Sequence, residues 1–206
     1  TNADAMTINL EAISSCGYQI GQDFFLGLDV AANILYKDGS YSIKDRSNAL
    51  NTNSLISFFE DLAKEYRLTY LEDPLQETDW QGWSTITQKL GGNVIIVGDD
   101  LLATDPTRVK KAIEVKACNA ILIKPNQIGT ITETLQVIKL ARSANWRVIV
   151  SHRSGETNDS FIADFAVGIK SDYVKFGAPA RGERIAKYNR LSSIEAELLA
   201  SRTKNS

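Results

Sequence analysis

Short runs of apolar residues alternate along the chain with longer segments that repeat apolar residues every three or four positions. The short runs predict β-strands, and they lie at 24–29, 69–72, 94–99, 120–124, 147–151 and 173–176. Nearly every position within them is apolar, as expected for strands that are buried on both faces.

The longer segments predict helices, several of which carry a start signal. One is expected from Ser54, one after Asp105-Pro106, where an N-cap precedes a proline at the first helical position, and one at Thr130, with Glu133 at capping-box spacing. Others are expected after Thr157, over 183–199, and at the N-terminus, where residues 1–13 indicate an amphipathic helix.

Strands that alternate with helices indicate βαβ units and a parallel sheet, and therefore the α/β class. One departure is Asp38-Gly39, which predicts a hairpin within residues 34–43. No linker or low-complexity segment divides the 206 residues, so we expect a single domain over 1–206.

Composition excludes several classes of protein. The net charge is −2 with acids and bases interspersed, which gives no basic footprint for nucleic acid. The two cysteines, Cys16 and Cys118, show neither metal-ligand spacing nor a disulfide framework, which suits a reducing compartment. No apolar run reaches membrane-spanning length and the N-terminus lacks a basic signal region, so we expect a soluble, cytoplasmic protein without a membrane span.

Each predicted strand ends on a titratable residue or within one residue of one. In chain order these are Asp29, Glu72, Asp99 (followed by Asp100), Lys124, His152 and Lys175. Any one of them alone is equally well explained as a loop cap or a solvated strand end. In a parallel αβ barrel, however, the C-terminal strand ends meet at one mouth, which is where the chemistry of such barrels lies. The set therefore predicts one polar site.

The residue types in this set indicate a metal-assisted reaction on an anion. Three carboxylates without a cysteine or histidine cluster favour a hard cation such as Mg²⁺ over zinc. The two lysines, His152 and Arg153 form an anion-binding set, which Ser154 and the Gly155 backbone extend. A lysine near other cationic charge can serve as a base. These parts suit removal of a proton α to a carboxylate.

Several stretches resemble the enolase family. They are GLDVAA (27–32), LEDPLQETDW (71–80), VGDDLLATDP (97–106), LIKPNQIGT (122–130), SHRSGETNDSFIADFAVG (151–168) and GAPARGERIAKYNRL (177–191). The resemblance implies a TIM-barrel-like C-terminal domain and the magnesium-dependent, reversible dehydration of 2-phospho-D-glycerate to phosphoenolpyruvate in glycolysis.

The resemblance also implies a role for each matching residue. Asp29, Glu72 and Asp99 would ligate the catalytic magnesium, and Glu72 and Asp99 would also face the substrate. Lys124 would be the base that takes the C2 proton. Substrate binding would fall to His152, Arg153, Ser154 and Lys175, of which Lys175 contacts the substrate carboxylate and Arg153 and Ser154 hold the phosphate and a second magnesium.

The front of the chain departs from the family pattern. Residues 1–19 are similar to the helix that follows the family's loop bearing the general-acid glutamate, so we expect a barrel truncated at its N-terminal side, with about six βα units and without the N-terminal capping domain. The resemblance then implies a fragment that is inactive alone. It also predicts that the first and last strands do not pair with each other.

Other interpretations remain. One is a different magnesium-dependent barrel that abstracts protons from carboxylates, against which the SHRSGET segment argues. Another is a non-catalytic enolase fragment that binds a surface or a partner. A third is a Schiff-base aldolase using Lys124, against which the acidic trio argues. For the intact enzyme the resemblance implies a homo-oligomer, a dimer or higher, with secreted or cell-surface forms in some family members.

Overall fold

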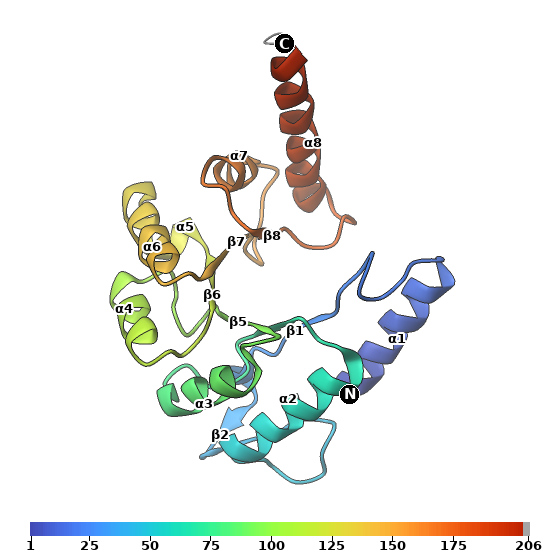
Figure 1. Ribbon diagram of the computed structural model, residues 1–206, viewed down its shortest axis with the longest axis vertical. Coiled ribbons are helices and arrows are strands. Elements are labelled where there is room, and N and C mark those ends of the chain that lie inside the picture. Colours follow the sequence, from blue (N-terminus) through green and yellow to red (C-terminus); the bar gives the residue numbers. More distant parts are fainter. Residues whose placement is uncertain (204–206) are drawn as a thin grey trace.

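The computed structural model, which describes residues 1–203, contains a curled parallel sheet with helices on its outer side (Figure 1). The six strands of this sheet are β1 (Gly27–Asp29), β4 (Tyr70–Glu72), β5 (Ile95–Gly98), β6 (Ala120–Ile123), β7 (Arg147–Ser151) and β8 (Tyr173–Lys175). Their order is β1-β4-β5-β6-β7-β8, and every pairing is parallel. The sheet is a half-barrel, which confirms the predicted α/β class and all six strands, although β1 begins at Gly27 and not at Phe24.

The helices follow the strands in the alternation that the sequence predicts. They are α1 (Asn2–Ser15), α2 (Thr52–Tyr66), α3 (Trp80–Leu90), α4 (Pro106–Glu114), α5 (Pro125–Ile128), α6 (Ile131–Ser143), α7 (Phe161–Gly168) and α8 (Gly182–Thr203), with a 3₁₀ turn, η1, at Ala32–Ile34. The predicted caps are present: Asp105 accepts from the N–H groups of Thr107 and Arg108, and Thr130 accepts from that of Glu133. The sequence reading missed α3 and the single turn α5. None of the helices within residues 1–203 is long and apolar enough to cross a bilayer.

The predicted hairpin is also present. Its strands are β2 (Tyr36–Lys37) and β3 (Ser40–Tyr41), which pair antiparallel. Asp38 and Gly39 between them have φ values of 49° and 85°. Two consecutive positive φ angles are typical of the type I′ turn, for which Asp-Gly is a preferred sequence.

Both faces of the central strands are buried, as the apolar runs predict. The main core lies between the sheet and the helices, and its strand members include Leu71, Ile96, Ile121 and Val148. A second, smaller cluster of Val97, Ala120, Leu122 and Ile149 contains the alternate residues of the same strands. Because successive strand residues point to opposite faces, this second cluster marks the inner side of the curl.

The two edge strands remain unpaired on their outer sides within residues 1–203. In the described part of the chain β1 pairs only with β4, and β8 pairs only with β7, which confirms that the first and last strands do not pair with each other. The inner side contains a cavity of about 670 Å³, bordered by Gly27, Ile95, Ile149 and Tyr173 and, at the C-terminal strand ends, by the polar residues described below.

An ion pair at the opposite end of the sheet gives a prediction for the pH dependence of stability. Asp172, just before β8, accepts from Nη1 of Arg142 at 2.5 Å and from the N–H of Val148 at 2.8 Å. Burial by itself would raise the pKa of Asp172, but the Val148 N–H and the Arg142 guanidinium lower it on balance. A lowered folded-state pKa contributes stability that is fully present above the ordinary value of 3.8 and is lost as pH falls through the lowered value.

We therefore expect Asp172→Asn to lower the free energy of unfolding by about 1.5–3 kcal/mol at pH 7, the range for hydrogen bonds to charged groups. As pH falls below 3.8 the difference from wild type should shrink, because wild-type Asp172 also becomes protonated. Urea unfolding between pH 7 and 2.5 measures this, with exposed Asp61→Asn as the matched control. A pH-independent difference would contradict the assignment.

Candidate functional site

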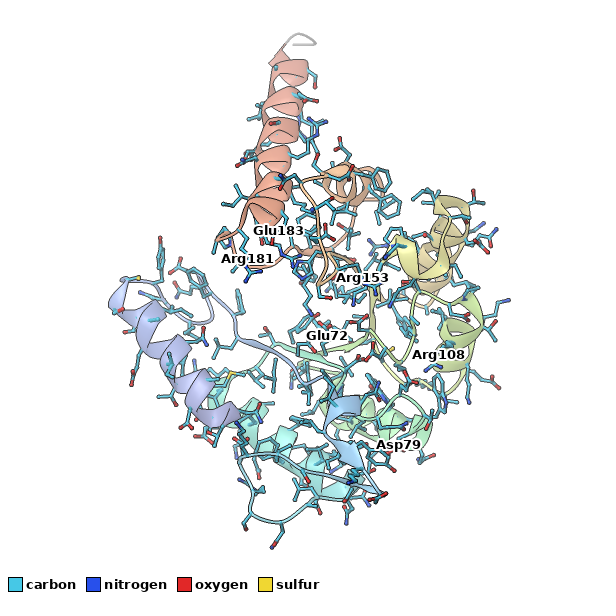
Figure 2. The ribbon with its side chains drawn as sticks, turned by 180° about the vertical axis from the view of Figure 1, so that it is seen from behind. Glu72, Asp79, Arg108, Arg153, Arg181 and Glu183 are labelled. Carbon is cyan, nitrogen blue, oxygen red and sulfur yellow. The ribbon has the colours of Figure 1, made fainter. Side chains whose placement is uncertain are left out.

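The C-terminal ends of the first and last strands meet through one lysine side chain. Asp29 and Glu72 end β1 and β4 and are register partners. Lys175 ends β8, and its Nζ lies 2.8 Å from Oδ2 of Asp29 and 2.8 Å from both carboxylate oxygens of Glu72. Figure 2 shows Glu72 near the middle of the molecule. The predicted convergence of these three residues is present.

This cluster holds more negative than positive charge in a buried setting. Glu72 is 0% exposed, and it also accepts from the Tyr70 hydroxyl at 2.5 Å. Burial raises the pKa of Glu72; Lys175 opposes the rise and the charge of Asp29 adds to it. Burial lowers the pKa of Lys175, yet the carboxylates of Glu72 and Asp29 raise it on balance. Two carboxylates share one ammonium, so the cluster favours further positive charge.

The next two strand ends form a second ion pair. Asp99 directly follows β5 and Lys124 directly follows β6, and Nζ of Lys124 lies 2.5 Å from Oδ2 of Asp99. The Lys124 side chain is only 14% exposed, and the Asp99 side chain only 12%. The other oxygen of Asp99, Oδ1, is buried without a hydrogen-bond partner among residues 1–203. A buried unpartnered carboxylate oxygen is costly, so it marks a position where a further donor or cation would be stabilised.

Asp73 binds the backbone of the segment that carries Asp99. Its carboxylate accepts from the backbone N–H groups of Asp99 at 2.9 Å and Asp100 at 2.8 Å, and its own φ is 41°. Burial raises the pKa of Asp73 to about 8, although both N–H groups oppose the rise. Sequence reasoning missed this residue; the only signal was that it adjoins Glu72 in the LEDP stretch.

Among residues 1–203, one trio has ligand atoms that all lie within 4.8 Å of one another, namely Asp73, Asp99 and Asp100. Only Asp99 belongs both to this trio and to the predicted metal ligands. Asp29 and Glu72 instead face Lys175. The assignment of Asp29, Glu72 and Asp99 as one ligand set therefore stays a prediction.

His152 lies beside the end of the last strand. Its backbone N–H donates to the carbonyl of Lys175 at 2.9 Å. Burial lowers the pKa of His152, with further lowering by Arg184 and Lys175, so its imidazole is neutral at pH 7. Gly177, with a φ of 84°, packs against this ring so closely that a Cβ would lie 2.8 Å from Cε1 of His152. Nδ1 of His152 is buried and lies on the side of the ring that faces Gly177.

Arg153 and Ser154 lie further along the same loop. Nη1 of Arg153 donates to Oδ1 of Asn126, which joins the loop after β7 to the short helix α5 after β6. Ser154 is exposed. The structure thus gathers Asp29, Glu72 and Lys175 into one cluster and Asp99 with Lys124 into a second, while Arg153 and Ser154 line the neighbouring loop.

The donor set fits a hard divalent cation. Every candidate ligand is a carboxylate oxygen, and residues 1–203 place no cysteine among them. The excess negative charge at Glu72 and the unpartnered Oδ1 of Asp99 are the two observations that favour such an ion.

Comparison with known proteins gives one family. Residues 1–205 match the family described as Enolase, C-terminal TIM barrel domain. The match spans almost the whole chain, including every residue of the site described above.

Proposed function

The chain belongs to the enolase family, through its C-terminal TIM barrel domain, and from this premise we propose that it carries the metal-binding and substrate-binding part of an enolase. The proposed reaction is the magnesium-dependent, reversible dehydration of 2-phospho-D-glycerate to phosphoenolpyruvate. The observation that carries the proposal is the meeting of Asp29, Glu72 and Lys175 across the two edges of the sheet, with Asp99 and Lys124 as a second ion pair.

In the proposed reaction the C2–H bond breaks and its electron pair forms the C2–C3 double bond, while the C3 hydroxyl leaves and takes up a proton to give water. Lys124 is the proposed base for the C2 proton, because its amine lies at a strand end beside the carboxylates proposed to hold magnesium, whose positive charge would favour the neutral amine. Lys175 is proposed to pair with the substrate carboxylate, and Arg153 and Ser154 to hold the phosphate. His152, whose imidazole is neutral, is proposed to contact the substrate.

Magnesium is proposed to be held by Asp29, Glu72 and Asp99. When bound, the cation stabilises the negative charge that develops on the substrate carboxylate. Ion binding would require Lys175 to exchange its carboxylate partners for the substrate carboxylate, since one ammonium now occupies the space between Asp29 and Glu72.

The test is a spectrophotometric assay of phosphoenolpyruvate formation by the natural protein that contains this sequence. We expect turnover of 2-phosphoglycerate that is lost when a chelator removes magnesium and returns when magnesium is added back. Chelator-insensitive turnover would contradict the metal role. Absence of phosphoenolpyruvate with saturating magnesium would overturn the proposed reaction.

A further inference from the structure

The loop that follows β7 and bears Arg153 and Ser154 is held by the last helix. We call residues 153–157 the 153–157 loop. Arg153 lies below the first turns of α8, whose start is marked by Arg181 and Glu183 in Figure 2. Residues 153–157 belong to neither a helix nor a strand, so regular backbone hydrogen bonding does not fix their conformation. Side-chain contacts therefore hold the loop, and several of them come from α8.

Lys187 is the main side chain that does this. Its ammonium lies 2.6 Å from Oε2 of Glu156 and 2.7 Å from the carbonyl oxygen of Thr157. The Lys187 side chain is 0% exposed and that of Glu156 is 15% exposed. Lysines are almost never fully buried unless they are paired, because removing the charge from water is costly.

Glu156 also binds the backbone of Arg153. Its other oxygen, Oε1, accepts from the backbone N–H of Arg153 at 2.8 Å. One carboxylate thus joins Lys187 of α8 to the residue proposed to bind phosphate. Burial alone would raise the pKa of Glu156, but Lys187 and the Arg153 N–H lower it on balance, so the carboxylate is ionised at neutral pH.

Two further residues on the same helix face hold neighbouring backbone. Nη1 and Nη2 of Arg184 donate to the carbonyl oxygens of Arg153 and Ser154 at 2.8 and 3.2 Å. The hydroxyl of Tyr188 donates to the carbonyl oxygen of Gly177, beside His152. Positions 184, 187 and 188 have i, i+3 and i+4 spacing, which places them on one face of a helix. This face of α8 contacts both loops around the proposed phosphate and histidine positions.

We infer that the Lys187–Glu156 ion pair positions the 153–157 loop for anion binding, and that Lys187 is a positioning residue for the reaction although it touches no substrate. The identity of the anion, a phosphorylated hydroxy acid, rests on the proposed function. The inference itself rests on the contacts that α8 makes with the loop.

The test removes the pair without leaving a buried charge behind. Lys187→Met alone would strand the Glu156 carboxylate, so the informative variant is Glu156→Gln with Lys187→Met, in which the glutamine oxygen can still accept from Arg153. Arg190→Met is the matched control. Arg190 lies on the same helix and its Nη2 is 2.6 Å from Oδ1 of Asp164 on α7, so its loss breaks an α8 ion pair that does not touch the loop.

Two readouts are needed, both on the natural protein. Steady-state kinetics with 2-phosphoglycerate and magnesium should show KM raised on the order of 10-fold to 100-fold in the double variant with kcat changed by less than about threefold, because Arg153 and Ser154 would bind phosphate equally in the ground and transition states. Hydrogen exchange should be faster at the backbone amides of residues 153–157 and unchanged in β4–β6. The Arg190→Met control should match wild type in both.

The outcomes separate this inference from the proposed function. Absence of wild-type turnover overturns the proposed function, and loop exchange alone then decides whether the ion pair positions the loop. Wild-type exchange in the double variant overturns the inference, whatever the activity. An active double variant with wild-type KM overturns it as well, even if its loop exchanges faster.

Discussion

Replacing Lys124 with arginine in the natural protein is expected to lower kcat for the dehydration of 2-phosphoglycerate on the order of 10²–10⁴-fold, the range that a positioned base contributes. Arginine keeps a positive charge beside Asp99 but does not give up its proton in proteins, so the variant removes the base and retains the ion pair. The measurement is initial-rate formation of phosphoenolpyruvate at saturating substrate and magnesium.

Lys124→Ala should lose as much activity, but it tests less, because Asp99 would then lose its lysine partner in a setting where its side chain is 12% exposed. The matched control is Lys89→Arg. The ammonium of Lys89 lies 2.7 Å from Oε2 of Glu60 on the outer surface. It should retain wild-type kcat. Retained activity in a folded Lys124→Arg variant would exclude Lys124 as the base.

The central strands of the sheet could be predicted because they are buried on both faces. Residues 120–123 are buried without exception, so the sequence there is an unbroken apolar run that ends at Lys124. The prediction that Asp29, Glu72 and Lys175 lie together followed from their positions at strand ends, since parallel strands in sequential order bring their C-terminal ends to one side. No local pattern was needed to connect residues as distant as Asp29 and Lys175.

Helix α3 was missed because its apolar signal is sparse. Its buried positions are Gly82, Trp83 and Ile86, its partly buried apolar residues Trp80 and Leu90 stand at the two ends, and the rest are polar. A glycine in the first turn weakens a helix assignment. In the structure Asp79 compensates, because its side chain accepts from the Gly82 N–H as the N-cap.

Contacts made by charged side chains could not be predicted, because the sequence does not say which lysines are buried. Lys187 lies on a predicted helix, where a lysine is normally solvated, yet it is 0% exposed. The partners of the site residues are likewise tertiary: Asp73 reaches the N–H groups of Asp99 and Asp100 only because β4 and β5 are neighbours. Sequence reasoning located the site at the strand ends but did not predict the contacts that orient it.

Glu72→Gln is expected to weaken magnesium binding on the order of 100-fold, by analogy with the 10-fold to 100-fold effect of changing residues that only support metal ligands. Glutamine is nearly isosteric, and its carbonyl oxygen can still accept from the Tyr70 hydroxyl and Lys175. Its amide nitrogen replaces an oxygen that lies 2.8 Å from Nζ of Lys175, so the change removes the charge and one acceptor. Isothermal titration of the natural protein with magnesium measures the affinity. Glu77→Gln, in the loop after β4 and 39% exposed at its side chain, is the control and should bind as wild type does.

In the absence of metal, Glu72→Gln should not lower the thermal stability of the protein, although it lowers the affinity for magnesium. Because burial raises the folded-state pKa of Glu72, its ionised form is less favourable in the folded than in the unfolded chain, and it lowers stability as pH rises above the ordinary value of 4.5. At pH 7 and in chelator, Glu72→Gln should therefore unfold at the same temperature as wild type or higher. At one magnesium concentration, the added ion should raise the unfolding temperature of wild type more than that of the variant, because a ligand that binds more tightly stabilises the folded state more. A variant that is destabilised in chelator and gains as much stability from magnesium as wild type would show that Glu72 is a structural carboxylate and not a metal ligand.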